Sequence, residues 1–198
     1  MKIKTYYRYL IYILEHKKNV FKVCWQKKMY KHAFTHDLSK FSKKEFVPYA
    51  KYFYIDKDTY KAEFKQAWEH HYKNNPHHWQ YWLDENKQPK SIPEKHIMEM
   101  ISDWEAMGLK FKDTAQSYYL KNYDSINLEY NTRVLLEYML NLNPSIANNY
   151  GHTLKEFANM YDEQQYNLNF GYIKENYGVD TYKICNRCGR FVYHWRKK

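Results

Sequence analysis

Glycine and proline are scarce in this sequence, with 5 of each among 198 residues. Turn-rich sandwiches and barrels use more of both, so the shortage argues against them and favours long helices. Three cysteines are too few for a disulfide framework. No apolar run approaches the roughly 18 residues that cross a membrane. The basic start precedes only a short apolar stretch without a small-residue cleavage site, so we expect no signal peptide, no membrane association and a cytoplasmic protein.

Hydrophobic residues are plentiful at 44%, and aromatic residues make up 20%, which is ample for a core. We therefore predict an all-α protein with one helical domain over 1–170 and a short C-terminal extension over 171–198. The formal net charge of +10 favours anionic partners, namely nucleic acid, nucleotides or phosphorylated small molecules. The same charge also fits an ordinary lysine-rich solvated surface, and charge alone does not separate the two.

Apolar periodicity predicts eight helices. The first carries one amphipathic stripe that includes His16 among apolar residues, which is either a core histidine or an inward metal ligand. Ser42 and Glu45 fit a capping box at the start of the third helix, and Pro48 predicts a kink or a later start there. The expected ranges are 5–28, 29–40, 43–53, 58–73, 93–107, 113–123, 127–140 and 152–167.

An adjacent imidazole and carboxylate, His36 and Asp37, stand near the end of the second expected helix, with Lys40 three positions later. Imidazole nitrogen suits Zn, Fe, Ni or Cu, and carboxylate oxygen suits Mg, Mn or Ca, so the pair can share one cation. The dipeptide alone is common by chance. The metal-binding interpretation of this pair is favoured because other expected helices carry further histidine and aspartate residues.

Four histidines fall within residues 70–78, surrounded by aromatic residues, and clustered histidine is a metal-binding signal. Helix phase places His71 on the buried face and His70 about 100° away. Spacing does not decide between His77 and His78. His32 is expected at the surface or behind a ligand.

Asp103 shares a helix face with His96, Met100 and Met107, and a carboxylate among apolar neighbours needs an ion or a hydrogen-bond partner. Glu99, one turn earlier, is the alternative carboxylate.

The tail contains Cys185 and Cys188 at the spacing of a zinc knuckle, with His194 as a possible third ligand. A closed zinc site needs four ligands, and Cys24 or His152 would have to complete it. The alternatives are a zinc site and a simple hairpin.

Taken in order, His16, His36-Asp37, His71, His78 and Asp103 resemble the HD-domain superfamily of helical, metal-dependent phosphohydrolases. The segment His36-Asp37-Leu38-Ser39-Lys40 is similar to one form of its motif. A closer resemblance, over roughly residues 10–120, is to an uncharacterised family of short bacterial and phage proteins. Its pattern continues through His70-His71-Tyr72, His77-His78, Glu99-Met100 and Asp103-Trp104.

The resemblance implies an HD-like helical bundle that holds one or two divalent ions, of Mn, Fe, Ni, Zn or Mg. The expected ligands are His16, His36, Asp37, His71, His78 and Asp103, with Asp37 able to bridge two ions. Asp37 and Lys40 are the expected catalytic residues, and Lys40 and Asn75 are expected to bind phosphate. Trp79 or Trp82 could stack on a base.

The implied activity is hydrolysis of a phosphomonoester or phosphodiester, with a nucleotide or another small phosphate ester as substrate. One alternative is a non-catalytic protein whose ions fix the fold while its basic surface binds nucleic acid or a partner protein. The other is a di-iron oxygenase with the HD fold.

Overall fold

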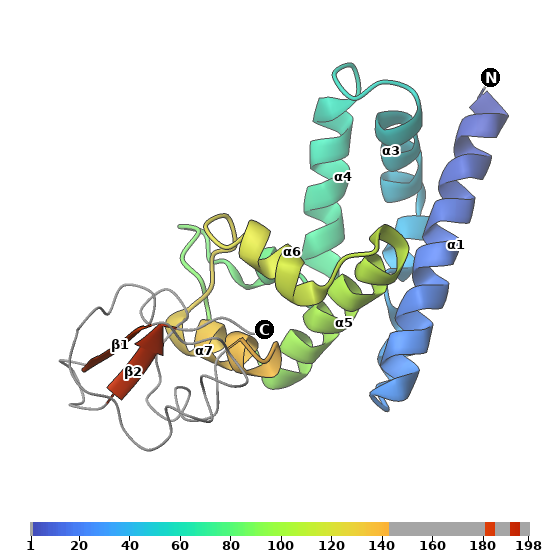
Figure 1. The fold of residues 1–198 in the computed structure, drawn as a ribbon. Coiled ribbons are helices and arrows are strands. Elements are labelled where there is room, and N and C mark those ends of the chain that lie inside the picture. Colours follow the sequence, from blue (N-terminus) through green and yellow to red (C-terminus); the bar gives the residue numbers. More distant parts are fainter. Residues whose placement is uncertain (1, 143–180, 185–190, 195–198) are drawn as a thin grey trace. The chain divides into compact units, whose positions relative to one another are not determined.

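The computed structural model describes residues 2–142, 181–184 and 191–194 (Figure 1). The chain divides into two compact units, Met1–Asn127 and Leu128–Lys198. Every regular element described in the first unit is a helix, which confirms the all-α prediction. Its helices are α1 (Lys2–Gln26), α2 (Tyr30–Thr35), α3 (Lys43–Tyr54), α4 (Lys61–Asn74), α5 (Glu94–Phe111) and α6 (Ala115–Lys121), with short 3-10 helices η1 (Leu38–Phe41) and η2 (Trp79–Trp82).

Helix α1 is the long element against which the first unit is built. Its predicted stripe is buried, from Tyr9 and Ile13 through His16 to Val20 and Val23. Helices α3 and α4 pair with each other, and α2, α3 and α5 all pack on α1 (Figure 1). None of the helices in the described part of the chain is long and apolar enough to cross a membrane.

Among the described residues, two apolar cores lie along α1. One is formed by Tyr9, Ile13, Tyr49, Ala50 and Ala67, around which aromatic side chains pack. The other is formed by Val20, Val23, Cys24, Ala33 and Ala106. His16 stands on the α1 stripe between Ile13 of the first core and Val20 of the second.

The second expected helix, 29–40, is wrong in one respect that matters for the site. Helix α2 ends at Thr35, and Asp37 adopts a left-handed conformation with φ 56° and ψ 27° before η1 begins. A non-glycine residue with positive φ is uncommon, although aspartate tolerates it better than most. The turn breaks the helix at the point where His36 and Asp37 must both face inward.

The capping box at the start of α3 is also wrong. Ser42 occupies the N-cap position but makes no side-chain capping bond. Glu45 is completely buried and accepts hydrogen bonds from other side chains instead. Pro48 neither delays nor ends α3, which runs from Lys43 through it to Tyr54.

In the second unit, helix α7 (Tyr130–Met139) is capped by Glu129, whose carboxylate accepts from the backbone amides of Asn131 and Thr132. Strands β1 (Thr181–Ile184) and β2 (Phe191–His194) form an antiparallel pair. The predicted helix over 152–167, the cysteines 185 and 188, and the predicted boundary at 170 lie outside the described residues.

Candidate metal centre

The left-handed turn at Asp37 brings the adjacent His36 and Asp37 side chains to the same buried region. The backbone amide of His36 donates to the carbonyl of His32, closing α2. His36 is 1% exposed and Asp37 is 5% exposed. The two oxygens of the Asp37 carboxylate face two different groups of histidines.

The first group joins His16 of α1, His36 and Asp103 of α5. His16 Nε2 lies 3.0 Å from Asp103 Oδ1 and 3.2 Å from His36 Nε2. His36 Nε2 lies 3.5 Å from Asp103 Oδ1 and 3.2 Å from Asp37 Oδ2. Three ligand atoms from three separate parts of the chain, those of His16, His36 and Asp103, therefore lie close enough to share an ion, with Asp37 Oδ2 beside His36.

The second group joins Asp37 to His71 of α4 and to the loop residues His77 and His78. Asp37 Oδ1 lies 3.4 Å from His71 Nε2 and 3.2 Å from His77 Nε2. The Nε2 atoms of His71 and His78 are only 2.8 Å apart. Both loop histidines are therefore close enough to share an ion with His71, and Asp37 stands between the two groups.

These spacings fit a metal ion. With metal–nitrogen bonds of about 2.0–2.1 Å, ligand atoms lie about 3.0 Å apart in octahedral and about 3.4 Å apart in tetrahedral geometry. Both Asp37 oxygens, Asp103 Oδ1 and His77 Nε2 are buried without a well-formed hydrogen bond to any described residue. Apart from the Lys40 ammonium, 2.6 Å from Asp37 Oδ2, the nearest charged or ring-nitrogen neighbours of these atoms are other potential ligand atoms, which a shared ion would hold together. These groups can hold a metal ion.

A buried glutamate orients His71 from behind. Glu45 Oε2 lies 2.8 Å from His71 Nδ1, and Glu45 Oε1 lies 2.7 Å from His70 Nδ1. Ser39 Oγ donates to Glu45 Oε2 at 3.0 Å. A carboxylate that accepts from Nδ1 places the proton there and leaves Nε2 free to bind an ion.

A longer relay lies behind His36. Its Nδ1 is 3.2 Å from His32 Nε2, and His32 Nδ1 is 3.4 Å from Glu99 Oε1. The other oxygen of Glu99 lies 2.7 Å from His96 Nδ1. His32 is buried rather than at the surface, and it also comes close enough to His36 and His77 to form a third possible ligand group. Glu99 therefore contacts His36 only through His32, whereas the Asp103 carboxylate lies among the ligand atoms themselves.

The pKa values show how the protein balances this buried charge. Burial alone raises the pKa of Asp37, but His36, Lys40 and His71 outweigh it and hold that pKa well below its usual value. Burial likewise opposes ionisation of Asp103, yet the adjacent His16 keeps its pKa well below normal.

The histidine pKa values move in both directions. Burial lowers the pKa of His36 to about 4. Burial, followed by the neighbouring His77 and His71, lowers the pKa of His78 well below normal. Burial also opposes protonation of His77, but the Asp37 carboxylate overcomes it and raises the pKa of His77. Neutral imidazole is the form that binds metal, so His36 and His78 are prepared for ligation.

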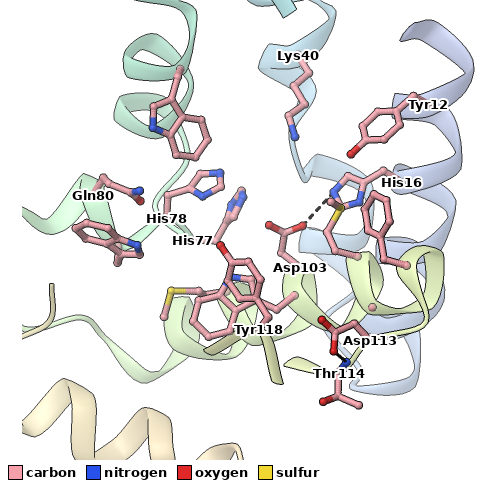
Figure 2. Close-up of a pocket in the computed structure, with 17 residues that line it drawn as sticks. Tyr12, His16, Lys40, His77, His78, Gln80, Asp103, Asp113, Thr114 and Tyr118 are labelled. Atoms are coloured by element: carbon pink, nitrogen blue, oxygen red, sulfur yellow. Dashed lines mark hydrogen bonds and ion pairs between the residues drawn. The ribbon is translucent and has the colours of Figure 1, made fainter. Parts of the chain in front are cut away.

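Lys40 connects the centre to a cavity of about 390 Å³. Its Nζ lies 2.6 Å from Asp37 Oδ2, and burial is outweighed by the Asp37 and Asp103 carboxylates, so the pKa of Lys40 is raised. Figure 2 shows Lys40 above the cavity, His77 and His78 on one side, and His16 with Asp103 on the other. The cavity therefore opens directly onto both ligand groups.

Every expected ligand lies in one of these groups: His16, His36, Asp37, His71, His78 and Asp103. The sequence reasoning left His77 and His78 as alternatives, and the structure brings both together. Asn75 lies behind the centre, where its amide donates to Ser39 Oγ at 2.9 Å and to the carbonyl of His71 at 2.7 Å. Trp79 lines the cavity, whereas the Trp82 indole donates to the carbonyl of Pro76.

Sequence reasoning missed Glu45 as a support for His71. The local pattern suggested a cap, and no signal in the sequence pairs Glu45 with a residue of α4. It also missed most of the cavity wall opposite the metal centre, which comes from α5 and α6. The only signal for that wall was the face of Met100, Asp103 and Met107, and all three line the cavity.

Comparison with known protein families matches residues 5–142 to a family of unknown function, DUF5662. This range includes every residue of the two ligand groups and of the cavity. No curated protein sequence and no solved structure matches the chain. Because the match covers more than half of the sequence, the chain belongs to the DUF5662 family.

Proposed function

We propose that this protein is a metal-dependent phosphohydrolase acting on a nucleotide or a related small phosphate ester. The observation that carries the proposal is the position of Asp37. Its two oxygens face separate groups of histidines, beside a lysine and at the edge of a cavity. The resemblance to the HD-domain superfamily supports the same activity and stays part of the proposal.

One ion would be held by His16, His36, Asp37 and Asp103, and a second by Asp37, His71, His77 and His78. Divalent ions in such a site lower the pKa of a water molecule and stabilise charge on the attacking and leaving oxygens of a phosphoester. The imidazole-rich ligand set favours Mn, Fe, Ni or Zn, whereas Mg prefers oxygen ligands.

The other residues prepare the site for an anion. Lys40 lines the cavity with a side chain that is 17% exposed, so its ammonium group can turn from Asp37 toward a phosphate oxygen. Glu45 and the His32–Glu99 relay hold His71 and His36 with their Nε2 atoms directed at the centre. The chain thus supplies charge compensation and orientation before the substrate arrives.

Five histidines and two carboxylates also suit iron, so a di-iron oxygenase is the second candidate. Metal identity separates the two activities. Tightly bound iron with a visible absorption band would favour oxygen chemistry, and activity with redox-inactive Zn would favour hydrolysis.

The first test is elemental analysis of protein purified without a metal-affinity tag. We expect one or two equivalents of metal in the wild type and none in Asp37→Ala, while Asp58→Ala, which removes an exposed carboxylate, keeps its metal. A panel of phosphoesters is then tested with the metal found. A wild type that takes up no Mn, Fe, Ni or Zn would refute the proposal and leave the non-catalytic nucleic-acid-binding protein as the alternative.

A further inference from the structure

The cavity beside the metal centre has two chemically different walls. The polar part carries the ligand groups and Lys40, whereas most of the other lining residues are aromatic and thioether side chains of α4, α5, α6 and η2. Its volume of about 390 Å³ is near the lower end of the roughly 300–1,000 Å³ found for small-molecule sites. This space suits one small ligand with a charged end and an apolar end.

The charge of the polar wall limits the number of phosphates. Lys40 is the one lysine or arginine among the described residues that line the cavity, and Asp103 and Asp113 add negative charge. Buried charges need compensation, because taking an ion out of water is costly. One phosphate group can be matched by Lys40 and the metal centre, but a triphosphate would leave several negative charges without partners.

The aromatic wall suits a flat ring. Trp104 and Tyr118 lie with their ring centroids 5.1 Å apart, and Trp79 lines the same cavity from η2. Aromatic side chains bind flat rings by stacking, and every nucleobase has a face that can stack in this way. An extended aliphatic chain cannot stack on these rings and would bind them less tightly.

Gln80 supplies a polar contact beside Trp79. Its side-chain oxygen is buried and has no hydrogen-bond partner among the described residues. Figure 2 shows its amide on the same side of the cavity as His77 and His78. An unpaired amide oxygen at this position is an acceptor for a ring N–H group, and leaving it unpaired is unfavourable.

From these walls we infer that the substrate is a nucleoside monophosphate, bound with its phosphate at Lys40 and the metal centre and its base against the Trp79 and Trp104 side of the cavity. Gln80 accepts a hydrogen bond from the base. This inference rests on the proposed phosphohydrolase function.

In the reaction, a water oxygen forms the new bond to phosphorus and the bond from phosphorus to the ester oxygen breaks. One water proton passes to the departing ester oxygen, so the products are a nucleoside and inorganic phosphate. No oxidant or reductant is needed.

The test compares adenosine and uridine monophosphates with glycerol 3-phosphate, which carries one phosphate but no ring, on the metal-loaded full chain. We expect the wild type to have a higher kcat/KM for the nucleotides. Trp79→Ala and Gln80→Leu should each lower that value about 10-fold, which corresponds to the loss of one stacking contact or one hydrogen bond. The value for glycerol 3-phosphate should change less than about twofold, since the lost contacts act only on the ring.

The matched controls are Trp25→Ala and Gln26→Leu, which change exposed residues at the end of α1. Both should leave all three substrates unaffected. The inference is overturned if glycerol 3-phosphate is hydrolysed as well as the nucleotides. It is also overturned if the Trp79 and Gln80 variants, shown to be folded by thermal unfolding, lose activity on every substrate equally.

Quenching of tryptophan fluorescence separates this inference from the proposed function, because Trp79 and Trp104 line the cavity. If no phosphoester is hydrolysed, the proposed function fails. Saturable quenching by adenosine monophosphate that is weakened in Gln80→Leu then still supports the assignment of the ligand, and absence of quenching in the metal-loaded wild type refutes it.

Discussion

Replacing Glu45 by glutamine should weaken one half of the metal centre and leave the other half intact. Glu45 is completely buried, and His71, His70 and Ser39 all lie within 3.0 Å of its carboxylate. Burial raises the pKa of Glu45, but hydrogen bonds from His71, His70 and Ser39 outweigh it and lower that pKa, so the group is a carboxylate. His71 belongs only to the second group of ligands, together with Asp37.

The size of the effect follows from the number of donors. Two carboxylate oxygens serve three donors, and the glutamine amide offers only one acceptor atom. His71 Nδ1 then becomes an acceptor from the amide, and its proton moves to Nε2, the atom that faces Asp37 and His78. Loss of a supporting carboxylate typically lowers metal affinity about 10–100-fold, or about 1.4–2.7 kcal/mol.

The assay is calorimetric titration of metal-free protein with Mn or Zn. We expect the affinity of the second ion to fall by that factor, while the ion bound by His16, His36 and Asp103 keeps its affinity. The matched control is Glu63→Gln, because Glu63 is an exposed carboxylate paired with Lys51 at 3.0 Å. Equal weakening of both ions, or unchanged affinity for both in a folded variant, would refute the role given to Glu45.

Three further outcomes are expected. Removing the metal with a chelator, from protein that holds it at about 1,000 times its Kd, should lower the free energy of unfolding by about 4 kcal/mol. For a chain of about 200 residues this lowers the Tm by roughly 8–16 °C. An unchanged Tm would mean that the ion does not stabilise the fold. Gly108→Ala should lower the Tm, because a Cβ there would clash with the backbone oxygen of Asp113, and overpacking costs about 1–3 kcal/mol. A Tm equal to that of the wild type would contradict this packing. In the metal-free protein, burial lowers the pKa of His36 from 6.5 to about 4. The unfolded chain therefore binds the proton more readily, so stability is complete above pH 6.5 and falls by about 3 kcal/mol toward pH 4. Urea unfolding across this range checks the sign, and stability that rises on acidification would refute it.

Periodicity was enough to find the parts of the site that lie on regular helices. His16 shares the buried stripe of α1, His71 lies on the buried face of α4, and Asp103 lies on the inward face of α5. A helix repeats every 3.6 residues, so the direction of a side chain follows from its position. The all-α class followed from the same patterns and from the shortage of glycine and proline.

The parts that could not be predicted depend on irregular backbone or on distant partners. His77 and His78 lie in a loop, which has no repeat to show which side chain points inward. The left-handed conformation of Asp37 interrupts the helix that periodicity predicted over 29–40, and periodicity carries no signal for a single residue of this kind. Glu45 matched a capping box, and only the fold brings His71, 26 residues later, to its carboxylate.

The position of His16 between two apolar cores has a consequence for how the protein loses its structure. Ile13 belongs to one core and Val20 to the other, and the histidine and carboxylate groups occupy the space between them. Local opening occurs most easily where apolar contacts are few, so in metal-free protein the amide hydrogens around His16 should exchange before those of the flanking segments that pack in the two cores. A bound ion would join the two cores into one cooperative unit. The supply of metal in the cell would then determine how long each copy of the protein resists proteolysis.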